Sequence, residues 1–128
     1  MRRILLAGCF SLSIFFFLPG ILFAANAPRP ENEQQKIEYL LNAIASSDLT
    51  FIRNGKEYKG PDAKAHLENK LNYAGSHIKT AEEFIQYIAG KSSITGKPYM
   101  VKLPDGTEIR SDAWLHAQLN KPNAPKTP

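Results

Sequence analysis

Apolar residues between positions 37 and 44 recur at the spacing of one helix face. They are Ile37, Leu40, Leu41 and Ile44, at positions i, i+3, i+4 and i+7. This pattern predicts a first helix over residues 33–45. A second helix is predicted over 61–75, because Pro61 suits the first turn of a helix. The apolar stripe of this second helix consists of Ala63, Leu67, Leu71 and Ala74.

Two more helices are predicted in the second half of the chain. The sequence Thr80-Ala81-Glu82-Glu83 is a capping box and begins a third helix, which Gly90 ends. Ser111 or Asp112 is the expected N-cap of a last helix. The apolar residues of that helix are Trp114, Leu115 and Leu119.

Two β-hairpins lie between these helices. The first is predicted over 49–53 and 56–58 around Asn54-Gly55, a dipeptide that suits turns with positive φ. The second spans 99–103 and 107–110. Phe51 and Arg53 share one face of the first strand because side chains alternate. The sequence therefore predicts an α+β fold, with about four helices packed on a small antiparallel sheet built from two β-hairpins.

The N-terminus has the three parts of a secretory signal peptide. Arg2-Arg3 precedes an apolar run over 4–18, and small residues follow between Ala24 and Ala27, where we expect cleavage. This predicts a signal peptide over 1–24, an extended leader over 25–32, a single domain over 33–120, and a disordered, proline-rich tail over 121–128.

Export through a cleaved signal peptide predicts a periplasmic protein with no membrane attachment after cleavage. Two alternatives stay open. Leu6-Ala7-Gly8-Cys9 has the letters of a lipoprotein cleavage box, so that Cys9 would carry lipid. Residues 4–25 also approach the ~20 residues that span a membrane, which would leave an uncleaved anchor.

Charge and composition argue against several functional classes. Without Arg2 and Arg3, 14 basic residues face 12 acidic ones, a net charge of about +2 with no basic cluster for nucleic acid. The only cysteine, Cys9, leaves with the signal peptide, so the mature chain has no thiol chemistry. The histidines lack metal-ligand spacing and the Gly-Lys pairs at 90–91 and 96–97 lack P-loop spacing. No cofactor or metal is therefore predicted.

Five motifs carry a resemblance to a known group. They are Phe-Ile-Arg-Asn-Gly (51–55), Ala-His-Leu (65–67) with Lys70 and Leu71, Thr-Ala-Glu-Glu-Phe-Ile (80–85), Ser-Ser-Ile-Thr-Gly-Lys-Pro-Tyr (92–99) and Trp-Leu (114–115). Together they resemble the YfeK-like family, a group of small exported bacterial proteins with a domain of unknown function. The resemblance covers about residues 34–119 and implies a periplasmic single domain without an established activity.

The same resemblance has a structural implication. Family members often carry cysteines at positions that correspond to Leu49 and Leu103 of this chain. The resemblance therefore implies that an apolar contact between these leucines replaces a disulfide, and that the two hairpins lie side by side in one sheet.

The candidate site centres on His66 and Lys70, which lie one helical turn apart. With Arg53 from the first hairpin, they are predicted to hold an anion or a carboxylate. The structural alternative is that Lys70 extends along apolar surface while His66 borders the core. The predicted ligand-binding residues are Arg53, His66, Lys70, Ser92, Ser93 and Tyr99.

These residues favour a small soluble binding or protein-interaction module of the cell envelope. Its expected partner is an envelope protein or a small anionic ligand. The alternative is a small periplasmic hydrolase that uses His66 with Ser92 or Ser93, but no G-x-S-x-G elbow precedes either serine. A purely structural accessory of an envelope complex is the third hypothesis.

Overall fold

The computed structural model describes residues 29–126. The predicted signal peptide, Cys9 and most of the leader therefore lie outside the described residues. In chain order the elements are α1 (Glu31–Ser46), β1 (Thr50–Arg53), β2 (Lys56–Lys59), α2 (Gly60–Ala74), the 3-10 helix η1 (Gly75–His77), α3 (Ala81–Glu83), the π-helix η2 (Phe84–Ala89), β3 (Met100–Lys102), β4 (Glu108–Arg110) and α4 (Ser111–Leu119).

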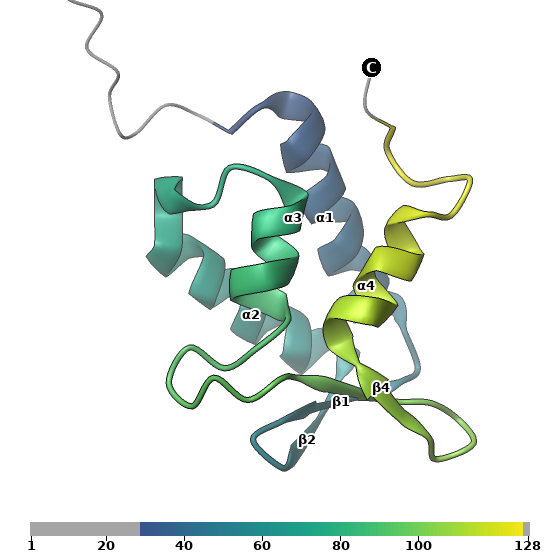
Figure 1. The fold of residues 1–128 in the computed structure, drawn as a ribbon. Coiled ribbons are helices and arrows are strands. Elements are labelled where there is room, and N and C mark those ends of the chain that lie inside the picture. Colours follow the sequence, from purple (N-terminus) through teal and green to yellow (C-terminus); the bar gives the residue numbers. More distant parts are fainter. Residues whose placement is uncertain (1–28, 127–128) are drawn as a thin grey trace, which may run out of the picture.

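The predicted α+β class is confirmed. The described residues form four α-helices and a four-stranded antiparallel sheet with the strand order β2-β1-β3-β4. Figure 1 shows the helices gathered on one side of this sheet. None of the helices within residues 29–126 has the length and apolar character needed to cross a membrane.

The two hairpins lie side by side because β1 pairs with β3. Phe51 of β1 is the partner of Tyr58 in β2 and of Val101 in β3, and Val101 is the partner of Ile109 in β4. Cross-strand partners share a face of the sheet. The buried Phe51 and Val101 show that this face is turned toward the helices. The adjacency of the hairpins that the family resemblance implied is thus confirmed.

The core lies between this face of the sheet and the helices. The stripe of α1 is fully buried as predicted, and Phe84, Ile85 and Ile88 of η2 pack in the same cluster. Gly60, at the start of α2, lets this helix approach the end of α1. A Cβ atom at position 60 would lie 2.3 Å from the carbonyl oxygen of Ile44.

The third helix differs from its prediction in its second half. Thr80 and Glu83 form the expected capping box, but the chain then continues as the π-helix η2. The last carbonyl groups of a helix have no partner inside it and must find one elsewhere. Here Ala89 accepts a hydrogen bond from the hydroxyl of Ser111 (2.6 Å), and Gly90 accepts one from the amide of Tyr99 (2.9 Å).

The N-cap prediction for the last helix is wrong. Ser111 is the first residue of α4, and Arg110 occupies the N-cap position without a capping side chain. The hydroxyl of Ser111 is committed to Ala89 instead, and the Asp112 carboxylate accepts from the guanidinium of Arg110. Tertiary contacts therefore displace the local capping pattern.

The two ends of the domain also differ from their predicted boundaries. Helix α1 begins at Glu31, so the described part of the leader is only Arg29 and Pro30. In the segment predicted as a disordered tail, Ala124 is buried and the hydroxyl of Tyr39 donates to Asn123. The described part of this segment therefore packs against α1.

A double variant tests the register of β1 and β3. Continued by one residue, this register sets Leu49 opposite Leu103. In a Cys9→Ser background, Leu49→Cys with Leu103→Cys is expected to form an intramolecular disulfide and to raise the free energy of unfolding by about 2–4 kcal/mol. Thiol titration and urea denaturation, each with and without reductant, measure the two effects.

The matched control pairs Leu49→Cys with Ile109→Cys, because β3 separates position 109 from β1. This control is expected to keep both thiols free. Two free thiols after oxidation of the 49/103 variant would contradict the register at this end of the sheet.

Candidate functional site

The sheet register places Arg53 beside Tyr99. Arg53 follows Phe51 by two residues, so its side chain is on the helix-facing side of β1. The β1–β3 register, continued by one residue, sets position 53 opposite position 99, and Lys56 is the partner of Arg53 in β2. The end of the sheet near the first hairpin turn therefore presents cationic groups toward α2.

A cleft of about 480 Å³ lies between the first hairpin, α2 and the loop that leads to Tyr99. We call it the cationic cleft. Its lining residues are Arg53, Asn54, Lys56, Tyr58, His66, Lys70, Ser92, Ser93, Ile94 and Tyr99. All six residues of the predicted site are among them. The lining holds three cations, of which two belong to that predicted set, and no carboxylate. That the six predicted residues bind a ligand stays a prediction.

His66 lies between Arg53 and Tyr99. Nη1 of Arg53 is 2.6 Å from each ring nitrogen of His66, and Nε2 of His66 is 3.4 Å from the Tyr99 hydroxyl. Only one nitrogen of a neutral imidazole carries a lone pair. A neutral ring that accepts from Arg53 at Nδ1 and donates to Tyr99 from Nε2 satisfies both neighbours. Burial, Arg53 and Lys70 all lower the pKa of His66, which favours this neutral form.

Lys70 joins α2 to the end of η2 and to the loop that follows. Its Nζ donates to the carbonyl of Ile88 (2.7 Å), the carbonyl of Lys91 (2.9 Å) and the hydroxyl of Tyr99 (3.2 Å). These bonds use all three hydrogens of the ammonium group. Burial, aided by the nearby Arg53, lowers the pKa of Lys70 to about 8. Lys70 therefore has a structural role, but one made by hydrogen bonds rather than by the predicted contact with apolar surface, and it also lines the cleft.

Two phenols supply neutral donors to the same cleft. The Tyr99 hydroxyl accepts from Lys70 and lies next to His66, and burial raises its pKa, so the phenol keeps its proton. The Tyr58 hydroxyl accepts from Nη2 of Arg53 (2.7 Å), and this bond lowers its pKa. Because each phenol oxygen already accepts a hydrogen bond from a cation, each O–H remains able to donate to a ligand.

The serine-containing loop is tied to the hairpin turn. The Asn54 amide donates to Ser92 Oγ (3.4 Å), and the Thr95 hydroxyl donates to the Asn54 side-chain oxygen (2.8 Å). Ser92 is buried and holds the loop, while Ser93 is exposed at the rim. Within residues 29–126, no hydrogen bond joins His66 to Ser92 or to Ser93.

Sequence reasoning did not assign Asn54, Lys56, Tyr58 or Ile94 to the site. Strand alternation was a usable signal for Lys56 and Tyr58, since both belong to the strand that pairs with the arm carrying Arg53. Asn54 is explained locally by its positive φ of 51° in the turn, so its bonds to the loop had no sequence signal. No set of three His, Cys, Asp or Glu residues within the described chain is placed to hold a metal ion.

Comparisons with known proteins place this chain in a family of unknown function. The uncharacterised protein YfeK of Salmonella typhimurium is 48% identical over 69 residues, which make up 53% of this chain and 58% of that protein. The aligned region thus spans a little over half the length of this relative. No solved structure shows significant similarity to the chain. The model of the DUF5329 family, described as a family of unknown function, matches residues 31–123, and the chain therefore belongs to this YfeK-like family.

Proposed function

We propose that this protein is an exported binding module of the cell envelope that holds an anionic group in the cationic cleft. The group belongs to a small anionic ligand or to an acidic side chain of an envelope protein. The observation that carries the proposal is the gathering of Arg53, Lys56 and Lys70 around one cleft whose lining includes no carboxylate. The export part of the proposal depends on the N-terminal signal pattern.

Electrostatics explain why this cleft favours an anion. Burial and the positive charge of Arg53 lower the pKa of both His66 and Lys70, and the charged groups of Arg53 and Lys70 have no counter-charge between them among the described residues. A bound anion would supply this counter-charge. It would also accept hydrogen bonds from the free O–H groups of Tyr58 and Tyr99. Hydrogen bonds to a charged acceptor are stronger than those between neutral groups.

The hydrolase alternative has less support. A general base works best when its pKa lies near the operating pH, and burial, Arg53 and Lys70 lower the pKa of His66. No carboxylate is among the described partners that orient the ring. Ser92 accepts hydrogen bonds from Asn54 and from the amide of Thr95, so it holds the loop rather than facing His66.

Removal of one cation tests the proposal. In calorimetric titrations with citrate as the probe, Arg53→Met is expected to weaken binding about tenfold or more, because a hydrogen bond to a charged group contributes about 1.5–3 kcal/mol. The matched control is Lys64→Met. Lys64 is another cation of α2, but it bonds to Asn42 and lies outside the cleft lining. Equal citrate affinity in Arg53→Met, Lys64→Met and the unaltered protein would contradict anion binding at this cleft.

The pH dependence of citrate affinity is a second test. An anion stabilises protonated Lys70, so binding raises a pKa that is about 8 in the free protein. Affinity is therefore expected to fall as the pH rises through about 8, a range in which citrate itself stays fully ionised. In Lys70→Arg the fall should be shallower, because a guanidinium stays charged up to a pH of about 12. An identical slope in both proteins would exclude Lys70 as the titrating group.

A further inference from the structure

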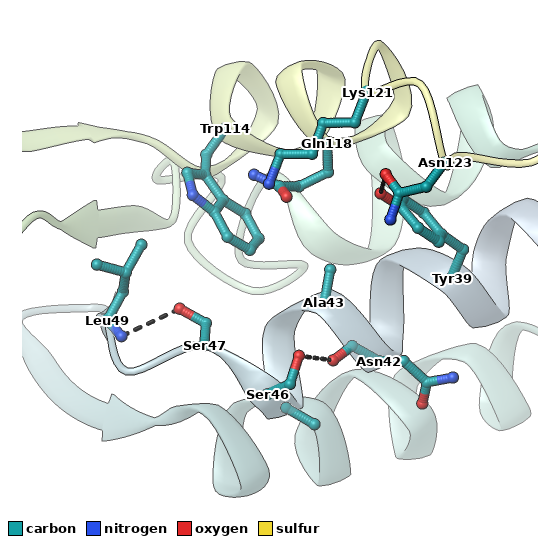
Figure 2. A pocket seen from close by; sticks show the side chains of 11 residues that line it. Tyr39, Asn42, Ala43, Ser46, Ser47, Leu49, Trp114, Gln118, Lys121 and Asn123 are labelled. Atoms are coloured by element: carbon teal, nitrogen blue, oxygen red, sulfur yellow. Dashed lines mark hydrogen bonds between the residues drawn. The ribbon is translucent and has the colours of Figure 1, made fainter.

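A second cavity, which we call the α1–α4 groove, lies between α1, α4 and the segment that follows α4. Its volume is about 820 Å³, and it shares no lining residue with the cationic cleft. Figure 2 shows Trp114 of α4 and Tyr39 of α1 at opposite ends of the groove, with Ala43 on the surface of α1 between them. A cavity of this size accommodates a small organic ligand.

Gln118 is the most informative residue of the groove. It is only 7% exposed and lines the groove, yet its carboxamide makes no hydrogen bond with any described residue. Within residues 29–126 no fully buried side-chain nitrogen or oxygen lacks a hydrogen-bond partner, so the carboxamide of Gln118 stays open to the solvent of the groove. A carboxamide offers two N–H donors and one acceptor oxygen. The groove therefore contains a polar group for which a ligand can supply the missing partners.

The rest of the lining combines apolar surface with polar groups that are almost all uncharged. Asn42, Asn123 and Ser47 contribute amides and a hydroxyl, and Lys121 is the only charged residue. The Tyr39 hydroxyl donates to the side-chain oxygen of Asn123 (3.3 Å), which leaves the amide hydrogens of Asn123 able to donate elsewhere. Groups of this kind match a neutral ligand that both donates and accepts hydrogen bonds.

Aromatic surface completes the groove. The indole of Trp114 is held by an edge contact with Phe51, with ring centroids 5.6 Å apart and an interplanar angle of 80°. Its N–H makes no hydrogen bond with a described residue. Tryptophan and tyrosine combine an apolar ring with a polar atom, so they suit ligands that are apolar on one side and hydroxylated at the edge.

From this arrangement we propose that the α1–α4 groove binds a saccharide. The C–H faces of a sugar ring pack on Trp114 and Tyr39, and its hydroxyls pair with the carboxamides of Gln118 and Asn123. A peptide fits less well. Extended peptides are commonly recognised at a free sheet edge, and no strand of the described sheet lines this groove, which lies between α1 and α4.

Trp114 is the only tryptophan of the chain, so its fluorescence reports directly on the groove. Titration of the protein with triacetylchitotriose and with maltotriose is expected to give a saturable change in emission with at least one of them. Gln118→Leu is expected to weaken that binding about tenfold or more, because the paired carboxamide is lost. The same substitution should leave the melting temperature of the free protein nearly unchanged, since the carboxamide makes no hydrogen bond with a described residue and is open to the solvent of the groove.

Two matched controls make the test specific. Gln86→Leu removes an exposed glutamine of η2 and should leave the saccharide response unchanged. Arg53→Met alters only the cationic cleft and should also leave the saccharide response unchanged. The saccharide proposal and the anion proposal can therefore fail separately.

Three results would overturn the saccharide proposal. The first is no saturable response to either sugar up to a concentration of about 10 mM, which corresponds to binding weaker than about −3 kcal/mol. The second is unchanged saccharide affinity in Gln118→Leu. The third is a response to triglycine without a response to either sugar, which would assign the groove to peptides.

Discussion

The position of the Lys70 ammonium group determines how this small domain builds its cationic cleft. The group sits at the end of η2, where it donates to the carbonyls of Ile88 and Lys91 and to the hydroxyl of Tyr99. Carbonyl groups at a helix C-terminus carry partial negative charge, so they partly offset the cost of burying a cation there. Without this contact, α2 would keep only the longer contact of His66 with the Tyr99 hydroxyl as a described side-chain hydrogen bond to the loop that supplies Ser92 and Tyr99.

The sheet provides the second constraint. Because β1 pairs with both β2 and β3, its residues meet neighbours from both hairpins. Arg53 thereby reaches Tyr58 of its own hairpin and His66 of α2 at once. The same strand places Phe51 against Trp114 of α4. One short strand thus contributes to the cationic cleft at its end and supports the α1–α4 groove from its middle.

The two cavities differ in chemistry. The cationic cleft gathers charge, while the α1–α4 groove is lined mainly by amides, hydroxyls and aromatic rings. If both proposals hold, one domain would contact an acidic group and a sugar through separate surfaces.

Local patterns predicted the elements and much of the cationic cleft. The stripe of α1, the Asn54-Gly55 turn and the capping box at Thr80 depend on short-range geometry, and the structure has all three. Strand alternation placed Arg53 on the face of Phe51. Lys70 lies between Leu67 and Leu71 of the apolar stripe of α2, an unexpected place for a lysine, and its ammonium group donates to two backbone carbonyls there.

Long-range contacts account for what the sequence did not reveal. Ser111 has the residue type of an N-cap, but the carbonyl of Ala89 competes for its hydroxyl. Gln118 resembles an ordinary polar residue of a helix surface. Its burial depends on how α4 and the chain after it pack against α1, and no local pattern reports that packing. The α1–α4 groove was therefore not predicted.

The most direct test of the account is amide hydrogen exchange in the loop that Lys70 anchors. The amides of Ser92 and Tyr99 bond to the carbonyls of Lys97 and Gly90, close to the Lys70 contacts. In Lys70→Met we expect both amides to exchange at least about tenfold faster, while amides in the middle of α1 keep their protection. Unchanged exchange at Ser92 and Tyr99 would show that Lys70 does not hold this part of the structure together.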